Sequence, residues 1–172
     1  MKLFLVAFLI FTVPQTKVEA TGEKMEWQEL SHVSQQLKTE SKPVLIDLYT
    51  SWCYWCKVMD KKTYSDKNVI QYLKANFYSV KLNAETRETV KWNGKEFDYS
   101  FNYKCNEFAL YATQGQLAFP TTVIIPEAGS DPVAIGGYLD PQEMESILKY
   151  FGSGSFKSES FQTYQANFKS TW

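Results

Sequence analysis

The sequence has 172 residues, of which 44% are hydrophobic and 16% are aromatic, and this is enough apolar side chain for one well-filled core. Its 18 basic and 19 acidic residues give a net charge of −1, and no run of like charge occurs. This balance excludes the basic stripe that binders of nucleic acid or anionic membranes need, so we expect no nucleic acid as a partner.

The N-terminus is typical of an export signal. Met1 and Lys2 give a basic start, residues 3–13 form a nearly unbroken apolar run, and residues 18–20 include the small residues that a signal peptidase reads. A run of about 11 apolar residues is shorter than the roughly 20 that cross a bilayer as a helix, so an uncleaved anchor is the weaker alternative. We therefore predict a cleavable signal peptide over residues 1–20 and a periplasmic or secreted protein.

Helix and strand signals alternate in the rest of the chain. A stripe at helical spacing comprises Trp27, Leu30, Val33 and Leu37, and residues 43–49 form an apolar run that predicts a buried central strand. The further predicted elements are a helix at about 53–62, a helix opened by Asp66 as its N-cap, a strand at 77–82, a helix at 106–113, strands at 121–125 and 133–139, and a helix from 140 to about 151. This order predicts an α/β protein with a central mixed β-sheet flanked by helices.

Two segments stand outside this alternation. Residues 83–105 read as an insertion that decorates the domain, with a β-hairpin turn at Asn93-Gly94. Residues 152–155 resemble a flexible linker, and beyond them aromatic side chains recur at helical spacing. This tail is either a helix that packs on its own domain, which we favour, or a partner-binding segment. The expected organisation is a signal peptide at 1–20, one domain at 21–151, and a linker with an aromatic segment at 152–172.

The strongest chemical signal is the run Trp52-Cys53-Tyr54-Trp55-Cys56-Lys57. Two cysteines one helical turn apart can close a small disulfide ring. The first then lies at a helix N-terminus, where unpaired N–H groups and the helix dipole favour a thiolate. A thiolate at Cys53 can attack a disulfide, and the thiol of Cys56 can resolve the mixed intermediate.

Other interpretations of the cysteines stay open. Half of a zinc site is one, but no second pair exists and His32 is the single histidine, so no metal is predicted. A purely structural disulfide is another. Cys105 is left over, either as a third redox-active or intermolecular cysteine or, as we favour, as an ordinary buried thiol.

Residues 47–57 resemble the active-site strand and turn of the thioredoxin superfamily. Asp47 matches the buried acidic residue of that family, Trp52 its tryptophan, and Lys57 the lysine after its second cysteine.

The resemblance extends over roughly residues 43–151, with 83–105 as an unmatched excursion. The run Lys81-Leu82-Asn83 is similar to the next strand of the family, whose lysine approaches the buried aspartate. The run Phe119-Pro120-Thr121-Thr122-Val123 resembles the cis-proline segment that lies against the cysteines.

This resemblance implies a thioredoxin-like fold and a protein-disulfide oxidoreductase. Cys53 would be the nucleophile and Cys56 the resolving thiol, while Asp47 would accept the proton of Cys56 and Lys81 would moderate the pKa of Asp47. The alternative is a buried ion pair with no catalytic role. The residues expected to contact substrate are Trp52, Tyr54, Trp55, Phe119, Pro120 and Thr121.

The chain departs from thioredoxins between the two cysteines, where it has Tyr54-Trp55 in place of Gly-Pro. These positions tune the redox potential, so an oxidase or isomerase role stays open beside the favoured reductase role. No metal or organic cofactor is expected. The expected partners are proteins that carry dithiols or disulfides and a membrane or soluble redox protein. A non-enzymatic binding module of the same fold is the rival interpretation.

Overall fold

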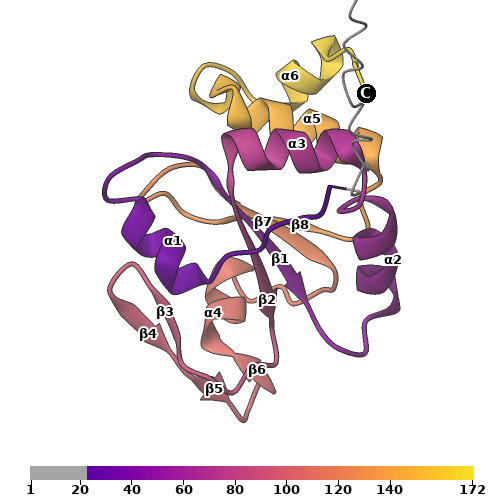
Figure 1. Ribbon diagram of the computed structural model, residues 1–172. Helices are drawn as coiled ribbons and strands as arrows, with labels where there is room; N and C mark the ends of the chain where they lie inside the picture. The colour runs from indigo at the N-terminus through magenta and orange to yellow at the C-terminus, as the bar shows by residue number, and fades with distance from the viewer. Residues whose placement is uncertain (1–22) are drawn as a thin grey trace, which may run out of the picture.

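A four-stranded sheet forms the centre of the computed structural model, which describes residues 23–172; the predicted signal peptide lies outside the described residues (Figure 1). Strand β1 runs parallel to β2 and antiparallel to β7, and β7 pairs antiparallel with β8, which gives the order β2-β1-β7-β8. The strands are β1 (Val44–Tyr49), β2 (Tyr78–Asn83), β7 (Thr121–Ile125) and β8 (Val133–Gly136). The predicted mixed sheet and α/β fold are confirmed.

Helices cover both faces of this sheet. One face packs against α1 and α4, and the other against α2, α3 and α5. The helices are α1 (Leu30–Gln36), α2 (Tyr54–Lys62), α3 (Lys67–Asn76), α4 (Glu107–Ala112), α5 (Pro141–Gly152), the short 3₁₀ helix η1 (Ser155–Lys157) and α6 (Phe161–Asn167). Since β1 is covered on both faces, its residues are almost fully buried, as its unbroken apolar run predicts.

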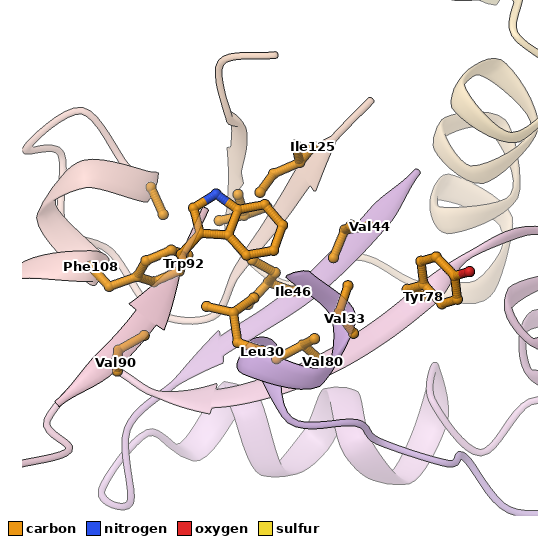
Figure 2. Close-up of a cluster of buried hydrophobic side chains, with 12 residues drawn as sticks. Leu30, Val33, Val44, Ile46, Tyr78, Val80, Val90, Trp92, Phe108 and Ile125 are labelled. Carbon is orange, nitrogen blue, oxygen red and sulfur yellow. The ribbon is translucent and has the colours of Figure 1, made fainter. Parts of the chain in front are cut away.

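The insertion contributes side chains to the hydrophobic core, whereas the sequence predicted only a decoration of the domain. Its first hairpin, β3 (Val90–Trp92) and β4 (Lys95–Phe97), turns through Asn93 and Gly94, whose φ angles of 50° and 77° fit the predicted Asn-Gly turn. A second pair, β5 (Tyr99–Ser100) and β6 (Cys105–Asn106), was not predicted. Figure 2 shows side chains of the first hairpin, including Trp92, inside the core cluster with residues of α1, β1, β2 and α4. The insertion therefore completes one layer of the core.

The segment before α1 differs from the prediction. The helix begins at Leu30, and the chain before it is extended, with the backbone N–H of Gln28 donating to the carbonyl of Ser79 at 2.8 Å. Trp27 packs edge-to-face against Tyr64, with ring centroids 4.9 Å apart. A partly buried apolar residue at a sheet edge carries the same hydrophobic signal as one on a helix, so the predicted helix began one turn too early.

The C-terminal segment folds back onto the domain. At residues 152–155, where a flexible linker was predicted, α5 runs through Gly152 and η1 begins at Ser155. Glu145 on α5 is fully buried, and its carboxylate accepts hydrogen bonds from Ser170 Oγ at 2.6 Å and from the backbone N–H of Thr171 at 2.8 Å. Lys149 Nζ donates to the same carboxylate at 2.6 Å. Burial alone would raise the pKa of Glu145, but these hydrogen bonds lower it to about 2.

The substitution Glu145→Gln is expected to lower the free energy of unfolding by about 2 kcal/mol at pH 7, because it weakens charge-assisted hydrogen bonds to the tail. The loss should shrink as the pH falls from about 4.5 toward 2, where the wild-type carboxylate itself is protonated. Urea unfolding at several pH values measures both the loss of stability at pH 7 and its decrease at low pH. The matched control is Glu96→Gln, at an exposed ion pair with Lys91, and it should change stability by under about 0.5 kcal/mol.

Candidate redox site

The cysteine pair lies at the start of α2, just after the end of β1. Cys53 is the N-cap of α2, and its Sγ accepts a hydrogen bond from the backbone N–H of Cys56 at 3.0 Å. The two residues form a disulfide with their Cα atoms 5.3 Å apart. Both are buried, with 4% and 3% of their surface exposed. A thiolate released at Cys53 would face the free N–H groups of the first helical turn, which stabilise negative charge.

Behind the disulfide, β1 and β2 bring a buried carboxylate and a lysine together. Asp47 is 2% exposed and stands opposite Lys81 in the parallel register, and Lys81 Nζ donates to Asp47 Oδ2 at 2.7 Å. Burial raises the pKa of Asp47 to about 6, and the charge of Lys81 keeps it from rising further. Such a carboxyl group can take and release a proton near neutral pH.

Asp60 is a third member of this cluster that sequence reasoning missed. It lies on α2 and also accepts a hydrogen bond from Lys81 Nζ. Burial favours the neutral amine of Lys81, but the two carboxylates outweigh it and raise the pKa of Lys81 above its usual value. Asp60 follows Cys56 by four residues, one helical turn, and that spacing is the signal that could have identified it.

Three aromatic rings lie close to the ammonium group of Lys81. Lys81 Nζ lies 4.8 Å from the ring centroid of Tyr49, 5.4 Å from that of Trp27 and 6.0 Å from that of Tyr64. These cation–π contacts stabilise the charged amine within a partly buried site. Tyr64 and Trp27 are further residues that sequence reasoning did not assign to the site.

An exposed aromatic rim surrounds the buried disulfide. Trp52, Tyr54 and Trp55 are 65%, 69% and 54% exposed. Trp52 packs edge-to-face on Phe119 with ring centroids 6.0 Å apart, and its indole N–H donates to Glu85 Oε1 of the insertion at 2.9 Å. Apolar rings held in the open beside a reactive pair are suited to binding another polypeptide.

The segment before β7 has the predicted cis-proline, because the Phe119–Pro120 peptide bond is cis. Pro120 is buried, and its carbonyl accepts from the backbone N–H of Gly137 at 2.8 Å. Thr121 is also buried, and its hydroxyl donates to the carbonyl of Ala118 at 2.8 Å. The structure thus brings Phe119 to the aromatic rim, while the side chain of Thr121 is engaged within the protein.

Cys105 is a free, buried cysteine at 3% exposure, packed with Leu48, Ala84 and Ala109. Burial raises the pKa of its thiol, and the nearby charge of Glu85 raises it further. A thiol in such surroundings is a poor nucleophile at neutral pH.

Within residues 23–172, no group of three or more histidine, cysteine, aspartate or glutamate side chains is arranged to hold a metal ion. None of the helices in this part of the chain is long and apolar enough to cross a membrane.

Comparison with known proteins agrees with this geometry. The sequence profile of the thioredoxin-like domain family matches residues 30–152. A thiol:disulfide interchange protein DsbD of Campylobacter jejuni is 27% identical over 114 residues, which are 65% of this chain but 17% of that protein. The chain therefore spans about a sixth of the length of this relative.

Two solved structures share the fold. A DsbH oxidoreductase matches with a TM-score of 0.56 and 15% identity, over 83% of this chain and 94% of its own. A thioredoxin-fold protein from Helicobacter pylori matches with a TM-score of 0.59 and 17% identity, over 73% of this chain and 81% of its own. With the profile match over residues 30–152, these findings show that the chain belongs to the thioredoxin-like family.

Proposed function

We propose that this chain is a thiol–disulfide oxidoreductase that reduces protein disulfides in an extracytoplasmic compartment. The observation that carries the proposal is the Cys53–Cys56 disulfide at the start of α2, backed by the buried Asp47–Lys81 pair. The name of the Campylobacter jejuni relative, a thiol:disulfide interchange protein, supports the same chemistry.

The catalytic cycle uses the reduced form of the pair. The thiolate of Cys53 attacks one sulfur of the substrate disulfide, which forms a mixed disulfide and releases the other substrate sulfur as a thiolate. Cys56 then gives its proton to the carboxylate of Asp47, and its thiolate attacks Cys53 Sγ. The second substrate thiolate leaves and takes up a proton. The disulfide seen here is the product, and a reducing partner protein must return two electrons to it.

The aromatic rim favours protein substrates. Trp52, Tyr54 and Trp55 present apolar rings on the surface next to the reactive pair, with Phe119 packed behind Trp52. A polypeptide that carries apolar side chains beside its disulfide would bury these rings as it binds. Pro120 would shape the groove beside them. Since it has no backbone N–H, it would also donate no hydrogen bond to the thiolate.

The proposed location and domain organisation follow from the sequence. Residues 1–20 would direct export and be cleaved, residues 21–151 would form the redox domain, and residues 152–172 its C-terminal segment. The basic start, apolar run and small residues of the N-terminus support export to the periplasm or beyond the cell.

Replacing the nucleophile tests the mechanism directly. The substitution Cys53→Ser should abolish the reduction of insulin disulfides, because a serine hydroxyl does not form the attacking thiolate. The control is Cys105→Ala, which should retain the wild-type rate. Full activity in Cys53→Ser would exclude this mechanism and favour a binding module of the same fold.

The redox potential of the pair decides the direction of electron flow. We expect equilibration in glutathione buffers to give a value nearer to about −270 mV, as in a reductant, than to about −120 mV, as in a disulfide donor. A value close to the latter would assign the chain an oxidase or isomerase role with the same residues.

The substitution Asp47→Asn should slow resolution of the mixed disulfide and remove the rise in rate as the pH increases through about 6, where the wild-type carboxyl loses its proton. The pKa of Asp47 is raised on folding, so its contribution to stability is greatest below about pH 4 and is lost as the pH rises through about 6.

The same variant should therefore unfold at higher urea concentration than the wild type at pH 7, by a margin that narrows at pH 4. The exposed Asp131→Asn should show neither effect. A wild-type pH profile in Asp47→Asn would mean that another group takes the proton.

A further inference from the structure

The exposed large apolar side chains gather at one edge of the sheet. In residues 23–172 they lie in the redox loop (residues 52–57), at the tip of the β5–β6 hairpin and in the turn before β7, with Val133 of β8 as the exception. They are Trp52, Tyr54, Trp55, Phe101, Tyr103 and Leu117. Because Thr121 at the start of β7 pairs with Leu48 near the end of β1, the turn and the redox loop lie at the same edge.

The β5–β6 hairpin lies at this edge as well, at the bottom of Figure 1. The backbone N–H of Asn106 in β6 donates to the carbonyl of Ala84 at 2.7 Å. The next residue, Glu85, accepts the indole N–H of Trp52 at 2.9 Å. Two hydrogen bonds and one peptide unit thus join the hairpin to the redox loop, so the two are neighbours on the surface.

The tip of this hairpin carries two aromatic side chains in the turn between its strands. Phe101 and Tyr103 are 78% and 64% exposed. The ring of Phe101 packs edge-to-face on that of Tyr99, with centroids 5.3 Å apart, and the guanidinium of Arg87 lies 5.3 Å from the centroid of the Tyr99 ring. Glycine and small polar residues are usual in such turns. Rings that are exposed there, and oriented by neighbouring side chains, are typical of a binding surface.

The proposed reaction requires a polypeptide at this edge. A protein disulfide must bring one sulfur to Cys53, so the substrate chain on either side of that sulfur crosses the surface around the redox loop. The aromatic rim contacts the chain close to the sulfur. Apolar side chains farther along the same substrate would reach the hairpin and bury Phe101 and Tyr103, which stabilises the complex.

We propose that Phe101 and Tyr103 at the tip of the β5–β6 hairpin form a second docking surface for the protein substrate, beside the aromatic rim. This surface binds apolar side chains of the polypeptide that carries the disulfide, at a distance from the reacting sulfur. The two residues therefore determine specificity, in favour of proteins over small disulfides. The inference rests on the proposed function, because it names a determinant of substrate choice for the same site.

The test compares a protein substrate with a small one, with dithiothreitol as the electron donor in both assays. In the double variant Phe101→Ser/Tyr103→Ser, KM for insulin should rise about tenfold with little change in kcat, because two binding rings are lost and the reacting atoms are untouched. The rate with hydroxyethyl disulfide should stay at the wild-type value, because this molecule has no polypeptide that could contact the hairpin.

Two further variants serve as controls. Phe101→Leu/Tyr103→Phe keeps the tip apolar and should retain most of the affinity for insulin. Val133→Thr is the matched surface change, because Val133 is 40% exposed and pairs with Ile124, near the end of β7 that is remote from the redox loop. It should show wild-type kinetics with both substrates.

An unchanged KM for insulin in the double variant overturns the inference. An equal loss with both substrates also overturns it, because the hairpin would then support the site instead of binding substrate. Unchanged insulin kinetics together with lost binding to phosphatidylglycerol vesicles, or with a lost dimer in sedimentation, would assign the rings to a membrane or to a second copy of the chain. Failure of the proposed function has a different signature, namely full activity in Cys53→Ser.

Discussion

The burial of Asp47 beside Lys81 is the constraint on which the site depends. Strand β1 is covered on both faces, so a carboxyl group within it has little access to water. The parallel neighbour β2 places the cation of Lys81 opposite it, and Asp60 from α2 adds a second carboxylate on the same lysine, which raises the pKa of Asp47 further. The burial of this charge weakens the fold, yet it gives Asp47 a pKa near 6, where proton transfer at neutral pH is efficient.

The direction of the strands explains why so many functional features meet at one edge. Since β1 and β2 are parallel, both end at the same edge of the sheet. β1 continues into the cysteine pair, and β2 continues from Lys81 into the insertion. The backbone N–H of Ala84 donates to the carbonyl of Tyr49 at 2.8 Å, which keeps the two exits together.

Features with local signals could be predicted from the sequence. The central strand and the Asn-Gly hairpin depend on near neighbours, and the structure has both. The spacing of Asp60 after Cys56 is a local signal, but its contact with Lys81 could not be predicted, because it depends on how α2 packs beside β2. Glu145 belongs to the same class, because a glutamate in a helix reads as a surface residue until a distant tail covers it.

The hydrogen bond from Trp52 to Glu85 joins the redox loop to the insertion. Trp92 of that insertion is in turn part of the core under α1. The redox loop is therefore linked, through the insertion, to the hydrophobic core. A thioredoxin scaffold that received only the Trp52–Lys57 loop would lack the acceptor for the indole, and its tryptophan would lose a hydrogen bond that orients the ring beside the cysteine pair.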